Sequence, residues 1–344
     1  MSSSVIIQAA PPGSSSYKQL VWRKVKIRKS LDEICHYMEL TLPVSEKEKI
    51  NKHYKIEVWY HNSLITTPGS RQLVTTIMVD EITNTADSSQ KNLTVIGRSP
   101  ARDIIDSKWS SQGPLRNMKL EEIVKVIAQK FDIIVTRMPR NDPETGTVFS
   151  FSWENESPWT KLINEADNQG YIFTSDGAGI LYIWKVAKSV RREKFILTEG
   201  QNIRDIQYTQ NGAEQFNEYI IRANGKEANQ TDSTCKNKRI LTINLTDMFV
   251  QEEVLRRRAR TEMLRRRENR TQVTVTGWGL SDWQIKNLGD TFEKDVIWGP
   301  NFLIPVKIPS LGLDDNLLIS QVEHTAEASA MTSVLTLVNK EAYS

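Results

Sequence analysis

A stretch of sequence that occurs twice, with an offset of 240 residues, constrains this chain more than any other feature. Residues 77–87 read IMVDEITNTAD, residues 317–327 read LLISQVEHTAE, and the apolar residues occupy the same positions in both copies. Downstream, residues 93–96 are matched by residues 335–338 at the same offset. Alternating apolar side chains are typical of half-buried strands. The repeat therefore predicts two similar β units near the two ends of the chain.

Two unrelated β-meanders would also show alternating valine and isoleucine. The shared Thr-Ala pair before the turn and the matched order of the neighbouring runs favour a duplication instead. A chain of 344 residues has room for two or three domains. The fold class that we expect is α+β, mostly β, with two similar antiparallel β-barrel, tube-forming domains that flank a central α+β domain.

The boundaries of these units follow from changes in the apolar period. We expect residues 1–98 to form the first barrel behind a flexible N-terminal arm, residues 99–190 to form the central domain, and residues 191–344 to form the second barrel with an inserted arginine-rich helix at 247–270. Three copies of a chain with two similar barrels can close a ring of six nearly equivalent units. Such a threefold ring would present a sixfold face to a partner.

The central unit combines helices with a hairpin. Apolar residues from Leu120 to Phe131 recur at helical spacing and predict a helix with one buried face. A second helix is predicted to open at Ser157-Pro158 and to stop at Gly170. The turn at residues 176–179 predicts a β-hairpin.

Two segments of the last unit are strongly polar. Eight arginines lie between Arg256 and Arg270, and such side chains pair with acids of a neighbouring surface or cover apolar surface with their stems. Contact with nucleic-acid phosphates through residues 251–270 is the alternative. The polar span 224–238 predicts a mobile loop. Candidate interface residues in this unit are Arg256, Arg257, Arg260, Arg267, Trp278, Trp283 and Trp298.

An early strand carries a basic face. In residues 21–29, Lys24, Lys26 and Arg28 share one side and apolar residues share the other. We expect this basic side to be solvated or to meet another subunit. The net charge of the whole chain is only +3, which argues against a surface that attracts nucleic acid everywhere.

Composition and end sequences narrow the setting. No run approaches the ~18 apolar residues of a membrane span, and residues 1–13 lack the features of a secretory signal. We expect a chain made in the cytoplasm, with Cys35 and Cys235 as buried thiols. The four histidines lack metal-ligand spacing, and no phosphate loop or dinucleotide fingerprint is present. We therefore predict no metal, no cofactor and no enzymatic activity.

A peptidoglycan hydrolase is the enzymatic alternative. Glu154 and Glu156 alternate along a predicted strand, so both carboxylates project to one side near the ~5 Å separation that retaining glycosidases use. Acids at a strand end before Ser157-Pro158 are more typical of a solvated loop. The prediction of no catalysis is therefore kept.

The order of the segments resembles the baseplate hub of phage Mu-like contractile tails, a family related to the phage late control protein and to the hub part of type VI secretion spikes. The resemblance covers nearly the whole chain. The segments that carry it are residues 93–98, 103–106, the helix 120–131, residues 159–163, 216–220, the arginine-rich helix with Gly277-Trp278, residues 298–301, and the ending 317–343.

The resemblance implies a structural role without catalysis. Such a hub is a homotrimer at the centre of the baseplate that joins the hexameric tail tube to the trimeric central spike and adapts their symmetries. Its lumen would let the genomic DNA pass during ejection without sequence-specific binding. Partners would be the tail tube protein, the spike protein and other baseplate and tape-measure proteins. The location implied is the virion tail of a bacteriophage, assembled in the host cytoplasm.

Overall fold

The computed structural model describes residues 4–61, 71–86, 91–138, 145–187, 195–245, 251–267, 269–279 and 297–343. The first part of the chain is built from strands because apolar and polar side chains alternate along it. In β3, Val25 and Ile27 are fully buried and the basic residues between them are not. The elements here are β1 (Ser4–Ala10), β2 (Lys18–Gln19), β3 (Lys24–Ser30), β4 (Tyr37–Pro43), the 3-10 helix η1 (Val44–Lys49), β5 (Lys55–His61), β6 (Gln72–Ala86) and β7 (Lys91–Arg98).

The middle part of the chain mixes helices with short strands, as the change of apolar period predicts. The second predicted helix is confirmed: it begins at Trp159, directly after Pro158, and ends at Gly170, whose φ is +68°. The elements are α1 (Arg102–Asp106), β8 (Leu115–Lys119), α2 (Leu120–Ala128), η2 (Gln129–Phe131), β9 (Ile134–Met138), β10 (Thr147–Phe151), α3 (Trp159–Gln169), β11 (Ile172–Ser175) and β12 (Ile180–Trp184).

The last part of the chain returns to strands around one long helix. That helix, α4 (Glu252–Arg267), is shorter than the predicted 247–270, since Arg270 already begins a strand. The other elements are β13 (Leu197–Thr198), β14 (Asp205–Thr209), β15 (Glu218–Ala223), β16 (Lys226–Thr231), β17 (Ile240–Asn244), β18 (Arg270–Thr276), β19 (Leu303–Ile308), η3 (Pro309–Leu311), β20 (Leu313–Glu327), β21 (Ala330–Val338) and η4 (Lys340–Tyr343).

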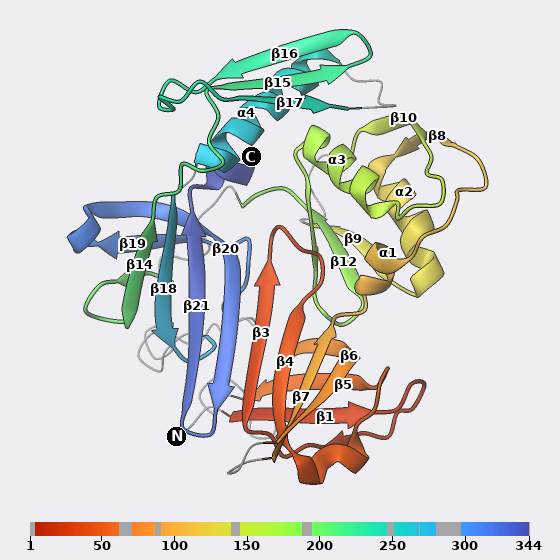
Figure 1. Cartoon of the computed structure of the whole chain (residues 1–344), viewed down its shortest axis with the longest axis vertical. Coiled ribbons are helices and arrows are strands. Elements are labelled where there is room, and N and C mark those ends of the chain that lie inside the picture. The colour runs from red at the N-terminus through yellow and green to blue at the C-terminus, as the bar shows by residue number, and fades with distance from the viewer. Residues whose placement is uncertain are drawn as a thin grey trace.

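Thirteen strands from the two ends of the chain form one continuous sheet (Figure 1). Its order is β14-β18-β21-β20-β3-β4-β7-β6-β5-β1-β2, and β19 pairs with both β20 and β13. The N-terminal and C-terminal strands meet where β20 pairs antiparallel with β3. The chain is therefore α+β and mostly β, as predicted, and its two end units share one sheet.

The sequence repeat appears in this sheet as two hairpins with the same register. In the first, Ile82 lies opposite Val95, and in the second Val322 lies opposite Leu335, each 240 residues later. Each hairpin has an irregularity in its first strand at the same place, after Val79 in β6 and after the equivalent residue in β20. Because an extra residue in one strand shifts all later pairing, a shared bulge indicates a shared backbone design.

The strands around the two hairpins are also ordered alike. β6 pairs with β5 beyond the hairpin and β20 pairs with β19, with Ile56 opposite Ile77 and Ile304 opposite Leu317. On the other side β7 is followed by β4 and β3, and β21 is followed by β18 and β14. One difference is that β13 runs parallel to β19, whereas β1 runs antiparallel to β5.

The prediction of a mobile loop over residues 224–238 is wrong for its first half. Residues Lys226–Thr231 form β16, which pairs with β15 across a tight turn at Asn224-Gly225. The φ values of these two turn residues are +46° and +75°, the backbone shape that a two-residue hairpin requires. The strand escaped the apolar pattern because its side chains are nearly all polar. Together β15, β16 and β17 form a small sheet on which α4 packs.

Each end unit encloses its own apolar core. The first core lies among β1 and β3 to β7, and the second lies among β18 to β21. Trp278, which follows β18 in sequence, crosses to the first core, where its ring stacks on Tyr60 at a centroid distance of 6.0 Å. The two end units are thus interlocked. A third core fills the middle unit between its helices and strands.

Candidate functional site: strand edges and the arginine helix

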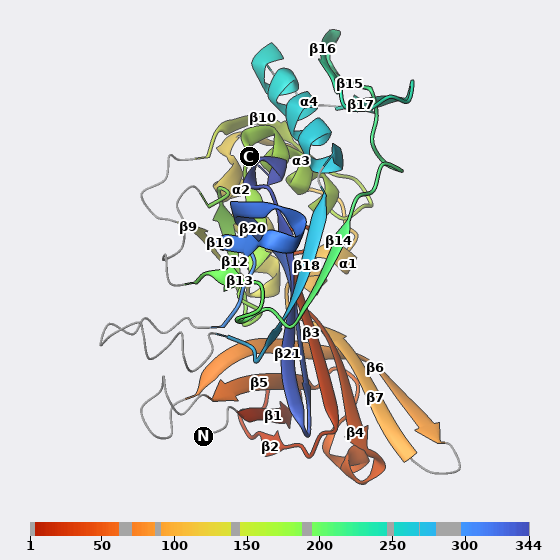
Figure 2. The same cartoon turned by 90° about the vertical axis from the view of Figure 1, so that its left-hand side faces the viewer.

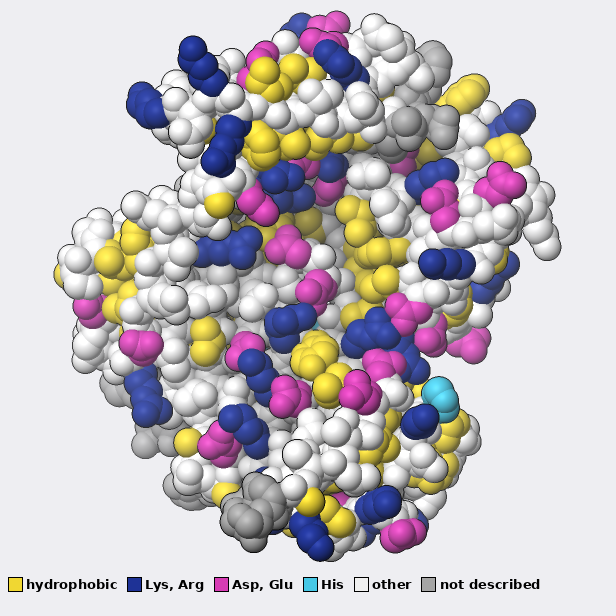
Figure 3. Space-filling model, viewed as in Figure 1, with side chains coloured by type: hydrophobic (Ala, Val, Ile, Leu, Met, Phe, Trp, Pro, Cys, Tyr) yellow, Lys and Arg dark blue, Asp and Glu magenta, His cyan; other side chains and the backbone are white. Residues whose placement is uncertain are grey.

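The contact between the two end units is lined by complementary charges. Along the β3–β20 pairing, Lys24 Nζ lies 2.7 Å from a Glu327 carboxylate oxygen and Lys26 Nζ lies 2.9 Å from Glu323. Figure 3 shows basic and acidic side chains interspersed along the middle of this face. The basic strand face that the sequence predicts to be solvated or between subunits therefore meets acids of the same chain.

The repeat leaves two strand edges without a ladder among the described residues. One is the outer edge of β6 beyond its bulge, where residues 81–86 pair with β7 on one side only. The other is β14, which ends the sheet and pairs only with β18. Figure 2 shows the β6–β7 hairpin extending away from the body of the molecule. Such edges expose backbone N–H and C=O groups that can pair with another chain.

The arginines of α4 bind acids on neighbouring elements. Arg258 is 7% exposed and lies 2.7 Å from Asp167 of α3 and 2.9 Å from Glu262 of its own helix. Arg265 also reaches Asp167, at 3.4 Å, and Arg266 lies 3.4 Å from Glu262. These charge-assisted contacts attach α4 to the middle unit. The ion-paired role that the sequence suggests for this helix agrees with these distances.

The four arginines predicted as interface candidates lie on the exposed side of α4. Arg256 pairs with Glu252 one turn earlier, and Arg257 donates to the backbone carbonyl of Asn168. Arg260 is exposed, and Arg267 lies 4.0 Å from Asp232. Their side chains are accessible to a partner, but the three with contacts already hold groups of this chain.

The predicted tryptophan anchors occupy a different environment from the one expected. Trp278 is 0% exposed and Trp298 2% exposed. The indole N–H of Trp278 donates to the Thr325 carbonyl at 2.9 Å, and Trp298 meets Phe195 edge to face. Both rings therefore stabilise the cores of this chain and are not surface anchors, because strands of both end units close over them. Trp283 lies outside the described residues.

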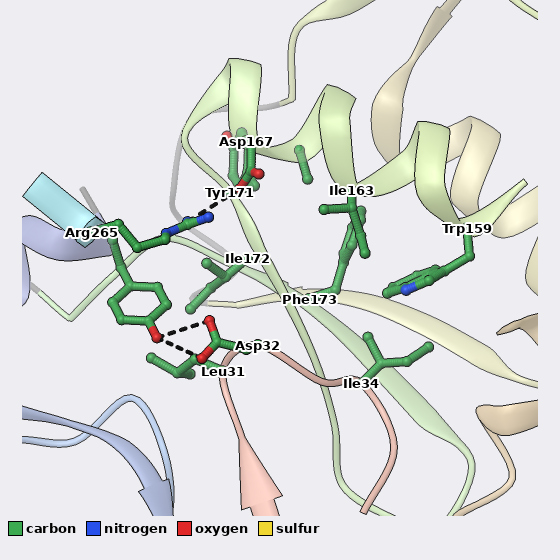
Figure 4. A pocket seen from close by; sticks show the side chains of 12 residues that line it. Leu31, Asp32, Ile34, Trp159, Ile163, Asp167, Tyr171, Ile172, Phe173 and Arg265 are labelled. Carbon is green, nitrogen blue, oxygen red and sulfur yellow. Dashed lines mark hydrogen bonds and ion pairs between the residues drawn. The ribbon is translucent and has the colours of Figure 1, made fainter. Parts of the chain in front are cut away.

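A cavity of about 250 Å³ lies where three parts of the chain meet (Figure 4). Its charged lining is already paired, since Tyr343 donates to the Asp32 carboxylate at 2.9 Å and Arg265 contacts Asp167. Burial raises the pKa of Tyr343. The cavity joins the C-terminal segment to the loop after β3 and to α3. We assign it a structural role.

The candidate carboxylates for hydrolysis lie on the surface. Glu154 and Glu156 are exposed, and Glu156 pairs with Lys161 at 3.2 Å. Among the described residues, no group of three or more His, Cys, Asp or Glu side chains is placed to hold a metal ion. Within the same residues, no helix has the length and apolar character needed to span a bilayer.

Two buried histidines link strands to the loops above them, and sequence reasoning missed both. His36 Nε2 donates to the Ser175 carbonyl at 2.9 Å, so its Nδ1 accepts from the Thr75 hydroxyl. His324 contacts the Ser333 hydroxyl at 2.8 Å and the Trp298 carbonyl at 3.1 Å. Burial lowers the pKa of both histidines well below its ordinary value. They are neutral structural groups at physiological pH.

Solved structures with the same fold come from phage tails. The 43 kDa tail protein of prophage MuSo2 from Shewanella oneidensis is 24% identical, with a TM-score of 0.76 and 98% of each chain covered. A tail protein from Neisseria meningitidis MC58 is 16% identical, with a TM-score of 0.77 and the same coverage. A type VI secretion component of E. coli, described as similar to T4 tail proteins gp27 and gp5, is 10% identical, with a TM-score of 0.59 over 96% of this chain and 76% of its own.

These likenesses establish the fold over nearly the whole chain, and they agree with the resemblance read from the sequence. No protein-family model matches the sequence, and comparison with curated proteins gave no match. The fold is therefore one that phage tail proteins adopt.

Proposed function

We propose that this protein is the structural baseplate hub of a contractile phage tail. Three copies form a ring in which six similar β units alternate, one pair from each chain. The ring joins the hexameric tail tube to the trimeric central spike and encloses the channel through which DNA passes. The observation that carries this proposal is the repeated strand order, β1-β5-β6-β7-β4-β3 in one unit and β13-β19-β20-β21-β18-β14 in the other.

The proposal assigns a role to each segment. The two tube-forming β-barrel domains are residues 1–98 and 191–344, and residues 99–190 form the central domain outside the ring. The tail tube, the spike and other baseplate and tape-measure proteins are the partners, and the virion is the location. The similarity to tail proteins and to secretion-spike proteins supports this role, which involves no catalysis.

The oligomeric state tests the proposal. We expect the purified chain to run as a trimer in light scattering, because each copy offers edges that another copy can cover. Dilution through the micromolar range should leave the trimer intact, since permanent interfaces of this kind bury well over ~1,000 Å². A stable monomer at micromolar concentration would contradict the hub.

Nucleic-acid binding through residues 251–270 gains no support from the side chains of α4. Most of its arginines contact carboxylates or a backbone carbonyl, and Arg258 is buried. Binding to phosphates would require these contacts to break. Retention of duplex DNA that weakens steeply with salt would revive this alternative.

A further inference from the structure

The unpaired edge of β6 has a paired counterpart in the second unit. Residues 321–327 of β20 pair with β21 on one side and with β3 on the other. Val322 and Ala326 are consequently fully buried. At the equivalent positions in β6, Ile82 is half-buried and Ala86 is exposed. The two segments differ because β6 lacks the strand that β3 provides to β20.

β14 is the counterpart of β3 in the second unit. The ladders align Val25 through Leu40 with Val95, and they align Ile206 through Val273 with Leu335, the repeat partner of Val95. β3 covers β20 with its outer edge, whereas the outer edge of β14 is unpaired in the described chain. Tyr208 is 43% exposed, although its counterpart Ile27 is fully buried.

We propose that β14 of one copy pairs antiparallel with residues 82–86 of β6 in the next copy, in the register that β3 and β20 use inside each chain. This inference rests on the proposed hub and names the contact that closes it. Transfer of the internal register places Thr85 opposite Gln207 and Thr83 opposite Thr209. Tyr208 then lies opposite Asn84 and becomes covered.

The chemistry of the two edges suits such a contact. The facing residues are threonine, asparagine, glutamine, alanine, isoleucine and tyrosine, so the pairs from 82–86 to 206–210 bring no like charges together. In Figure 1, β14 and β6 lie on opposite sides of the β20–β3 contact. Two different patches on opposite sides of a subunit give a head-to-tail contact, which is the kind that builds a closed ring.

A disulfide between copies tests the contact in the full-length protein. Residues directly opposite in an antiparallel pair have Cα atoms about 4.5–5.5 Å apart, within disulfide range. We expect the Thr85→Cys/Gln207→Cys double variant to shift from the one-chain band to a three-chain band on a non-reducing gel, and to return on reduction. Native thiols should stay out of this reaction, since Cys35 and Cys235 are buried and burial raises the pKa of Cys35 to about 12.

Two matched variants serve as controls. The Lys26→Cys/Thr325→Cys variant places cysteines at the equivalent pair inside one chain, so it should oxidise without any change in the number of linked chains. The Thr85→Cys/Thr209→Cys variant is displaced by two residues, where the diagonal distance of about 7–8 Å disfavours a disulfide. It should give much less three-chain product than the in-register pair.

The outcomes separate the contact from the hub. A trimer in light scattering that yields no three-chain band would overturn the β6–β14 pairing and leave the hub standing. Equal linkage in the in-register and displaced variants would overturn the register. A monomer in solution would overturn both, and a ladder beyond three chains would contradict a closed ring.

Discussion

Glu165 shows how a single buried carboxyl can set the stability of the middle unit. It lies on the inner side of α3 and is only 9% exposed. Burial raises the pKa of Glu165 to about 7, although a hydrogen bond with Gln169 opposes that shift. The unfolded chain ionises this carboxyl near its ordinary value of 4.5, so its contribution to folding becomes less favourable as the pH rises from 4.5 through 7.

We therefore predict that Glu165→Gln stabilises the protein at alkaline pH. The gain in unfolding free energy should be about 2–3 kcal/mol at pH 8 and below about 1 kcal/mol at pH 5. Urea denaturation at the two pH values measures it. Glu154→Gln is the matched control, because Glu154 is exposed in the same unit, and it should change stability by less than about 0.5 kcal/mol at both. An equal gain for Glu165→Gln at both pH values would contradict the argument.

At the scale of elements, the turn between β11 and β12 docks the middle unit onto the large sheet. Asp176 Oδ1 accepts from the backbone N–H groups of Ala178 and Ile180, at 2.7 and 2.9 Å, which shapes the turn. The Gly177 carbonyl then accepts from the Thr76 N–H of β6 at 2.8 Å. The hairpin itself is predictable from its sequence, but its contact with β6 depends on the tertiary structure.

Gly177→Ala should weaken this docking. A Cβ at Gly177 would lie 2.4 Å from both His36 Nδ1 and Thr75 Oγ1, and the φ of this glycine is +77°. We expect a loss of about 2 kcal/mol or more in thermal or chemical denaturation, since overpacking adds to backbone strain.

Gly170→Ala controls for the strain alone. Its φ is +68° and nothing lies within 4 Å of a Cβ there, so the loss should be about 1 kcal/mol. Equal losses in the two variants would show that the docking contact contributes little.

At the scale of the whole molecule, the β3–β20 contact holds the two ends of the chain together, and its charges can be inverted. Lys24→Glu/Lys26→Glu places four acids along this contact and should lower the free energy of unfolding by about 1–2 kcal/mol, because exposed pairs contribute roughly 0.2–1 kcal/mol each. Adding Glu323→Lys/Glu327→Lys restores the complementarity and should recover the loss.

Thermal denaturation at low and high salt is the measurement for this charge inversion. Salt screens exposed charges, so the deficit of the double variant should shrink at about 1 M salt. A quadruple variant that is no more stable than the double variant would show that these lysines act through packing and not through charge.

The sequence alone determined which parts of this protein are strands, which are helices and which two segments are copies of one another. Those properties depend on side-chain period and on turn residues, so the repeat hairpin and the start and stop of α3 could be predicted. β16 could not, because its polar side chains hide the period of a strand, although Asn224-Gly225 signals its turn.

Only the tertiary structure decided what each predicted face contacts. The basic side of β3 meets Glu323 and Glu327, and Trp278 and Trp298 lie in cores, because strands distant in sequence close over them. The physical reason is that a period reports which side of an element is apolar, whereas the partner of that side depends on how all the elements pack. The same packing leaves β6 and β14 with free edges, a difference between repeat copies that no local pattern contains.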